Sequence, residues 1–225
     1  MFLKNQGGIY WFVGLTLLAL VYCVLMRVNV LESSILITGI LCVSLIAIGK
    51  KEGYIFGLYN CISYAYVAYE NGLFGEVLLN LLFYVPTGIL GYFMWQKHQQ
   101  NQKVLARKLS FLNFLKILGS LIMAILILGF ILSQFEKQND PFLDATTNAV
   151  GICATLLMMY RYAEQWIFYI LLNCITISLW VLQYMNESAA ADTMIFMWML
   201  FLVNSLYGYF TWMKKAKAKS IIAHE

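Results

Sequence analysis

The chain contains eight long, nearly uncharged apolar segments, and this feature limits its possible folds more than any other. The segments fall at residues 9–27, 34–49, 53–70, 73–95, 110–134, 142–160, 165–185 and 192–213. A helix needs roughly 20 apolar residues to cross about 30 Å of hydrocarbon, and most segments approach that length. The runs are too uniform for the strands of a membrane barrel, in which apolar and polar residues alternate. We therefore predict an all-α membrane protein with eight transmembrane helices.

The composition supports this assignment and excludes several other classes of protein. Hydrophobic residues make up 62% of the chain and charged residues only 12%, whereas a soluble domain is about 25% charged. A soluble enzyme, a nucleic-acid-binding protein and a disordered regulator are therefore disfavoured. The first segment has one preceding basic residue, Lys4, and no small-residue cleavage site, so we expect a retained helix rather than a signal peptide.

The basic residues fall almost entirely on one side of the membrane when the eight segments are threaded through it. That side receives Lys4, Lys50, Lys51, Lys97, Lys103, Arg107, Lys108, Lys116, Arg161, Lys214, Lys215, Lys217 and Lys219, against Arg27 and Lys137 on the other. The acids Glu32, Glu70, Glu76, Glu136, Asp140, Asp144, Glu187 and Asp192 fall on the poorly basic side. Because basic loops stay in the cytoplasm, we expect both termini to be cytoplasmic in a multi-pass protein of the cell inner membrane.

Parts of the sequence occur twice. EGYIF at 52–56 matches EQWIF at 164–168, NCI recurs at 60–62 and 173–175, GYFMW at 91–95 matches GYFTW at 208–212, and Gly39 aligns with Gly151. We predict two parallel three-helix repeats joined by a linker helix (3+1+3), a plan known from transporters. The expected units are an extra N-terminal helix (1–32), the first repeat (33–96), a basic loop and linker helix (97–140), the second repeat (141–214) and a basic tail (215–225).

One helix face in the seventh segment is unusually rich in aromatic and amide side chains. Its members, spaced three or four residues apart, are Trp166, Tyr169, Asn173, Thr176, Trp180 and Gln183. Polar groups within a membrane face a partner or a cavity. Flat rings and neutral amides suit a planar, hydrogen-bonding ligand such as a nucleoside or a vitamin ring. We therefore predict a substrate site on this face.

Other segments contribute similar side chains. They are Tyr54, Asn60, Ser63 and Tyr64 in the third, Asn80, Tyr84 and Thr87 beside Pro86 in the fourth, and Asn204, Ser205 and Tyr207 in the eighth. These groups have a second interpretation, because Asn, Ser and Thr commonly form hydrogen bonds that hold transmembrane helices together.

Several absences bear on mechanism. No Asp or Glu lies clearly in the middle of a segment; Glu70, Glu76, Asp144 and Asp192 are near segment ends. Ion-coupled carriers usually need such a group at depth. No phosphate-binding G-x-x-x-x-G-K-[ST] loop is present. Neither histidine lies in a segment and no cysteines form C-x-x-C, so we expect no metal, no cofactor and no enzymatic activity.

The stretch GYIFGLYNCISYAYVAYENGLFGEVLLNLLFYVPTGILGYFMW at 53–95, the motif Glu164-Gln165-Trp166 and the terminal GYFTW resemble the PnuC family of nicotinamide riboside transporters. The resemblance spans about residues 33–214. It implies a 3+1+3 core similar in plan to the sugar-transporting SWEET proteins and a homotrimer. It also implies passive uptake of nicotinamide riboside, which a cytoplasmic kinase traps by phosphorylation.

The resemblance further implies that side chains of the repeat helices bind the substrate. Trp166, Asn173, Trp180 and Gln183 are the first candidates, followed by Asn60, Tyr64, Tyr84 and Asn204, with Tyr169 and Tyr207 on the same helices. Relatives of the same plan carry thiamine or riboflavin, and fold does not distinguish these substrates. A non-transporting membrane scaffold remains the alternative from another class, and a membrane-bound enzyme is the third.

Overall fold

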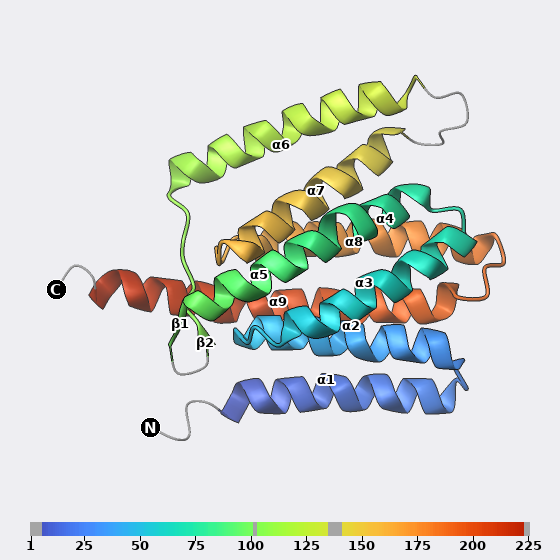
Figure 1. Cartoon of the computed structure of the whole chain (residues 1–225), viewed down its shortest axis with the longest axis horizontal. Helices are drawn as coiled ribbons and strands as arrows, with labels where there is room; N and C mark the ends of the chain where they lie inside the picture. The colour runs from blue at the N-terminus through green and yellow to red at the C-terminus, as the bar shows by residue number, and fades with distance from the viewer. Residues whose placement is uncertain (1–5, 101–102, 135–140, 223–225) are drawn as a thin grey trace.

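The computed structural model describes residues 6–100, 103–134 and 141–222, which form eight helical segments and one short hairpin (Figure 1). The helices are α1 (Gln6–Leu25), α2 (Val30–Ile48), α3 (Gly53–Glu70), the continuous run of α4 (Phe74–Leu78), η2 (Leu79–Tyr84) and α5 (Val85–Lys97), α6 (Phe111–Leu132), α7 (Pro141–Met159), α8 (Gln165–Met185) and α9 (Ala191–Ile222). The hairpin consists of β1 (Gln99–Gln100) and β2 (Lys103–Val104). The predicted all-α architecture is confirmed.

Seven of the eight helical segments in the described residues are long and apolar enough to cross a membrane. The exception is α3, whose five tyrosines, together with Asn60, Ser63 and Glu70, lower its hydropathy. Two of these side chains, Asn60 and Tyr64, are predicted substrate-binding residues. The protein is thus a multi-pass membrane protein.

Some helix boundaries differ from the predicted segments for local reasons. α2 begins at Val30 rather than 34, because the Asn29 side chain accepts a hydrogen bond from the Glu32 amide at 2.9 Å and caps the helix. α9 continues beyond residue 213 into a lysine-rich stretch, since lysine is a good helix former. The helix in the fourth segment passes through the π-helical turn η2 immediately before Pro86. Such a turn accommodates a proline, which cannot donate a backbone hydrogen bond.

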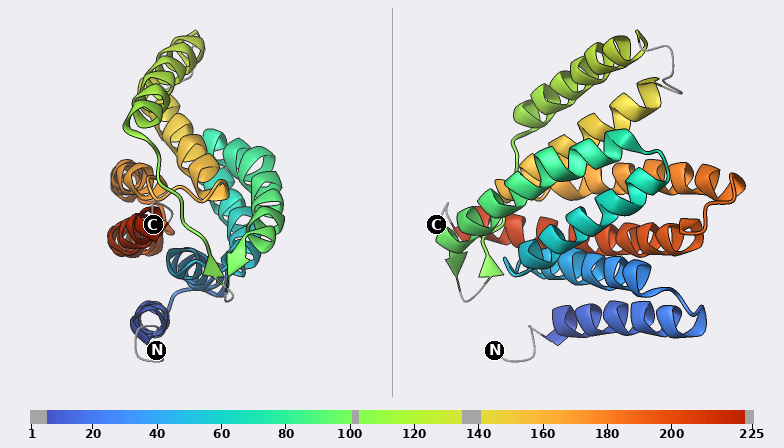
Figure 2. Two further views of the ribbon diagram at one scale, coloured as in Figure 1. Left: turned by 90° about the vertical axis from the view of Figure 1, so that its left-hand side faces the viewer. Right: turned by 45° about the vertical axis from the view of Figure 1, so that its right-hand side comes forward.

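The helices pack in a reciprocal pattern around the middle of the bundle. α2 packs against α3 and α9, whereas α7 packs against α8 and α5. The first helix of each predicted repeat thus contacts the third helix of the other. α1 and α6 lie at opposite edges of the bundle, beside α2 and α7 respectively (Figures 1 and 2). These contacts are those expected of two parallel repeats, which remain a prediction.

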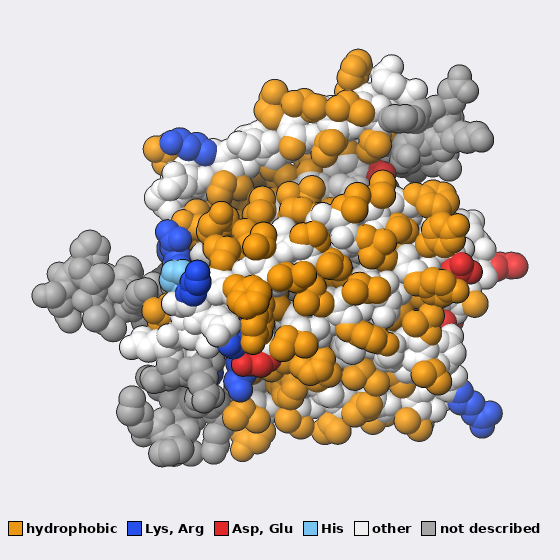
Figure 3. Space-filling model, in the orientation of Figure 1, with side chains coloured by type: hydrophobic (Ala, Val, Ile, Leu, Met, Phe, Trp, Pro, Cys, Tyr) orange, Lys and Arg blue, Asp and Glu red, His pale blue; other side chains and the backbone are white. Residues whose placement is uncertain are grey.

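Charged side chains separate towards the two ends of the bundle. Figure 3 shows basic groups gathered at the end where α1 begins and α9 ends, and acidic groups mainly at the other end. Lys4, Lys137, Glu136 and Asp140 lie outside the described residues, as do the side chains of Lys217 and Lys219. The sorting of the described charges agrees with the sequence-based threading.

The segment between α5 and α6 ties together the turns at the basic end. The Val104 amide donates to the Gly49 carbonyl at 2.8 Å, in the turn after α2. The Arg107 amide donates to the Arg161 carbonyl, also at 2.8 Å, in the turn after α7. The buried Glu164 side chain accepts from the Leu109 amide at 3.1 Å. This segment therefore connects corresponding turns of the two predicted repeats.

Candidate functional site

A cavity of about 160 Å³ lies in the middle of the bundle. Its lining comes from α2, α3, the α4–η2–α5 run, α7, α8 and α9, which are the six helical segments of the two predicted repeats. Among the described residues, none from α1 or α6 lines it. The cavity therefore lies where the 3+1+3 plan places a transport site.

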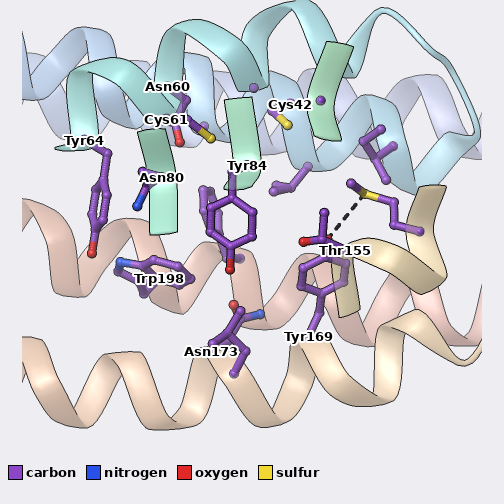
Figure 4. Close-up of a pocket in the computed structure, with 18 of the residues that line it drawn as sticks. Cys42, Asn60, Cys61, Tyr64, Asn80, Tyr84, Thr155, Tyr169, Asn173 and Trp198 are labelled. Carbon is purple, nitrogen blue, oxygen red and sulfur yellow. Dashed lines mark hydrogen bonds between the residues drawn. The ribbon is translucent and has the colours of Figure 1, made fainter. Parts of the chain in front are cut away.

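Aromatic side chains form much of the wall. They are Tyr54 and Tyr64 from α3, Tyr84 from η2, Trp166 and Tyr169 from α8, and Trp198 and Phe201 from α9. Figure 4 shows Tyr64 and Trp198 towards one end of the cavity, Tyr84 in its middle and Tyr169 towards the other end. Small-molecule sites are typically lined by apolar and aromatic side chains, with a few polar groups that fix the orientation of the ligand.

Three asparagine amides supply part of the polar lining. Asn60 Nδ2 donates to the Ile35 carbonyl at 2.7 Å, Asn80 Nδ2 to the Glu76 carbonyl at 2.8 Å, and Asn173 Nδ2 to Ser205 Oγ at 2.9 Å. In each case one N–H of the amide is used within the protein, which leaves the second N–H as a donor and the amide oxygen as an acceptor. At the end of the cavity near Tyr169, the Tyr169 hydroxyl lies 3.3 Å from Thr155 Oγ1 and 3.4 Å from Met158 Sδ (Figure 4).

Three buried polar atoms of lining residues have no hydrogen-bond partner among the described residues. They are the Tyr54 hydroxyl, Trp166 Nε1 and Trp198 Nε1. A buried donor without a partner costs about 1–3 kcal/mol, so such groups are normally satisfied. Each of these residues therefore carries a polar atom that no described group satisfies.

Gly39 and Gly151, which align in the sequence repeat, permit equivalent close contacts. A Cβ on Gly39 of α2 would lie 2.8 Å from the Phe201 ring of α9. A Cβ on Gly151 of α7 would overlap the Tyr84 hydroxyl of η2. In both places a glycine on the first helix of one half lets an aromatic ring from the third helix of the other half reach the cavity.

Glu76 is an acidic residue near the end of a span that lines the cavity and is only 9% exposed. The span starts at Phe74, so Glu76 lies in the first turn of α4, and α4 turns this residue inward. The position of Glu76 near a span end is as expected from the sequence, but the side chain reaches the cavity from there, so the absence of acids in the middle of the spans does not make the cavity free of charge.

Six of the ten predicted site residues line the cavity: Asn60, Tyr64, Tyr84, Trp166, Tyr169 and Asn173. Sequence reasoning left out of the site Glu76, Asn80, Thr155, Thr176, Trp198 and Ser205, which also line it. The signal in the sequence for Asn80, Thr176 and Ser205 is that they are polar residues inside apolar segments, where a polar side chain faces a partner or a cavity.

The other four predicted residues lie outside the cavity lining. Trp180 is fully buried and donates to the Tyr64 hydroxyl at 2.9 Å. Asn204 accepts from Trp11 Nε1 at 3.0 Å, and Tyr207 stacks on the Trp11 ring with centroids 4.3 Å apart. Gln183 is partly exposed near the end of α8. The face of α8 does run from Trp166 to Gln183, but the cavity covers only its part up to Thr176.

Residues of the cavity wall make contacts with buried tryptophans that do not line the cavity. Towards the basic end, Tyr54 packs edge-on against Trp95 with centroids 5.2 Å apart, and Trp166 packs edge-on against Trp212 at 6.1 Å. Towards the other end, Trp180 is bonded to the Tyr64 hydroxyl. No cluster of three or more His, Cys, Asp or Glu side chains that could hold a metal occurs in the described ranges.

Comparison with known proteins identifies the family. Residues 29–214 match the family described as nicotinamide mononucleotide transporter. A protein of Neisseria mucosa named nicotinamide riboside transporter PnuC is 36% identical over 196 residues, which cover 84% of this chain and 74% of that protein. A protein of the same name from Haemophilus influenzae is 35% identical over 185 residues, covering 80% and 78%.

A solved structure matches the whole arrangement. A crystal structure of the vitamin B3 transporter PnuC has a TM-score of 0.84 and 34% identity to this chain, and the match covers 94% of this chain and 92% of that one. The resemblance noted in the sequence is confirmed. The chain is a multi-pass membrane protein that belongs to the PnuC family of transporters.

Proposed function

We propose that this protein carries nicotinamide riboside across the cell inner membrane by facilitated diffusion. The observation that carries the proposal is the cavity between the two groups of three helical segments, with aromatic walls and amide side chains in its lining. Aromatic faces stack on the nicotinamide ring, and the amide oxygens accept hydrogen bonds from its carboxamide or from the ribose hydroxyls. The names of the relatives point to the same substrate.

The riboside fits the lining better than the mononucleotide does. The described lining residues include no Lys, Arg or His, and they do include Glu76. A phosphate group in a buried site needs cationic partners or several backbone N–H donors, and a nearby carboxylate repels it. The lining therefore favours a substrate without a phosphate. Thiamine and riboflavin also carry no phosphate group, and they are the alternatives within the transporter class.

The substrate-binding residues in this proposal are Trp166, Tyr169, Asn173, Asn60, Tyr64 and Tyr84. Trp180, Asn204 and Tyr207 support helix packing instead, as their contacts indicate, and Gln183 lies outside the cavity lining near the end of α8. This division replaces the interpretation in which all ten side chains contact substrate.

The transport cycle that we propose is alternating access by rocking of the two three-helix units about the cavity. Both termini lie in the cytoplasm, as the clustering of basic residues supports. A cytoplasmic kinase phosphorylates the riboside and so keeps uptake moving inward. Because the buried Glu76 side chain lines the cavity, the absence of acids in the middle of the spans no longer argues against ion coupling. The passive mechanism rests on the family resemblance and on the lack of a phosphate-binding loop in the sequence.

A homotrimer is the assembly that the resemblance implies. The apolar side chains on the outer faces of α1 and α6, such as Val24 and Phe130, are exposed in the single chain. Lipid or neighbouring subunits would cover them.

Calorimetric titration of the purified protein with three compounds tests the substrate assignment. We expect nicotinamide riboside to bind, and nicotinamide mononucleotide and thiamine to bind much more weakly. Binding of thiamine alone would replace the substrate but keep the transporter class, whereas binding of none of them would favour a non-transporting scaffold. Uptake into liposomes that is unchanged by an imposed proton gradient would support facilitated diffusion.

A further inference from the structure

Glu76 provides a carboxylate in a cavity that is otherwise almost free of charge. Its side chain is more than nine-tenths buried and lines the cavity from the first turn of α4. It lies close enough to Tyr64 and Tyr84 to interact electrostatically with both. A buried carboxylate is costly unless a cation or several donors stabilise it.

The surroundings of Glu76 add to the negative charge. Asp144 of α7 interacts electrostatically with Glu76 and lies close to Gly75, with its Oδ1 accepting from Asn148 Nδ2 at 2.8 Å. No described residue in the cavity lining is Lys, Arg or His. The charge at this end of the cavity is therefore suited to a cationic ligand.

The neighbouring aromatic rings are arranged as such a ligand requires. Tyr64 and Trp198 meet edge to face with centroids 6.0 Å apart, and both line the cavity together with Tyr84. In Figure 4 these three rings surround Asn80, towards the end of the cavity opposite Thr155. Aromatic faces attract a cation within about 6 Å, and a delocalised ring cation can stack on them as well.

We propose that Glu76 is a specificity-determining residue that selects a positively charged ring over a neutral one. The inference rests on the proposed function, since nicotinamide riboside carries a positive charge spread over its pyridinium ring. The ring occupies the end of the cavity formed by Glu76, Tyr64 and Trp198. The ribose points towards Tyr169 and Thr155, whose hydroxyls meet at 3.3 Å.

The test compares two ligands that differ in ring charge and little in shape. Nicotinamide riboside is the cation, and its 1,4-dihydro form has a neutral ring on the same ribose. Dissociation constants of both are measured on the purified full-length protein, on Glu76→Gln and on Glu70→Gln. Glu70 is an exposed acid at the end of α3 that does not line the cavity, so it controls for loss of one negative charge.

We expect the wild type and Glu70→Gln to prefer the cation by at least about tenfold, because an ion pair and cation–π contacts are lost with the neutral ring. Glu76→Gln should lose this preference while binding of the neutral form changes little. Equal weakening of both forms in Glu76→Gln would mean that Glu76 holds the ribose, and it would overturn the inference. So would an unchanged preference.

The wild-type ratio tests the inference even when Glu76→Gln does not fold, since a wild type that binds both forms equally contradicts it. In that case the proposed function stands, because the riboside still binds. A wild type that binds neither form contradicts the proposed function itself.

Discussion

Trp95 and Trp212 hold the two halves of the molecule together through matching contacts. Their rings pack with centroids 5.6 Å apart at an angle of 40°. Trp95 Nε1, on α5, donates to the Met158 carbonyl on α7 at 3.0 Å, and Trp212 Nε1, on α9, donates to the Ala47 carbonyl on α2 at 2.8 Å. Each third helix thus binds the end of the first helix in the other half. Separation of the halves at the basic end requires both hydrogen bonds to break.

The hydrogen bonds of these two tryptophans should contribute similarly to stability. Trp95→Phe and Trp212→Phe each remove one buried donor and leave a carbonyl behind, so each should cost about 1 kcal/mol beyond the loss of ring size. Thermal unfolding in detergent measures the effect. Trp166→Phe is the matched control, because its ring is equally buried and its Nε1 has no partner among the described residues. A control as destabilised as the two variants would show that ring size alone matters.

Gly39→Ala should disturb the wall of the cavity, which Gly39 itself lines. The added Cβ would lie 2.8 Å from the Phe201 ring and 2.9 Å from Asn60 Nδ2, and both of those side chains line the cavity. We expect a loss of about 1–3 kcal/mol in stability from overpacking, together with weaker substrate binding. Gly119→Ala on α6, where the Cβ would meet nothing within 4 Å, should leave both properties intact. Normal affinity in Gly39→Ala would contradict the assigned cavity wall.

Asn173→Ala and Asn204→Ala should separate substrate binding from helix packing. Asn173 lines the cavity and bonds to Ser205, so its loss should weaken binding of the riboside by about 1–3 kcal/mol. Asn204 does not line the cavity and forms hydrogen bonds with Trp11 and with the Val43 carbonyl, so its loss should lower stability but leave affinity unchanged. Titration calorimetry and thermal unfolding on the same preparations distinguish the two. Weaker binding in Asn204→Ala alone would place the site elsewhere.

The helical architecture was predictable because apolar length alone specifies it. The positions of Asn173 and Trp166 in the cavity lining could also be predicted, because the spacing of the polar side chains determines which face of α8 they share. Spacing cannot tell where along that face a cavity ends, so it also selects Trp180 and Gln183, which lie outside the cavity lining in the structure. Sequence also underestimated Glu76, because a residue near the end of a span can turn inward or outward.

The short hairpin at the basic end could not be predicted from its residues. Gln99–Gln100 and Lys103–Val104 are polar or weakly patterned, and the hairpin is fixed by contact with Gly49, which lies far away in the sequence. Long-range pairing of this kind leaves no local periodic signal.

The central claim is that the cavity carries nicotinamide riboside between the two sides of a membrane. Counterflow in liposomes that contain the purified protein and are loaded with unlabelled riboside tests it directly. We expect labelled nicotinamide riboside to accumulate transiently inside, and Asn173→Ala to slow this exchange while Asn204→Ala does not. Absence of exchange in wild-type liposomes under conditions where the protein is folded, or exchange of labelled thiamine instead, would contradict the claim.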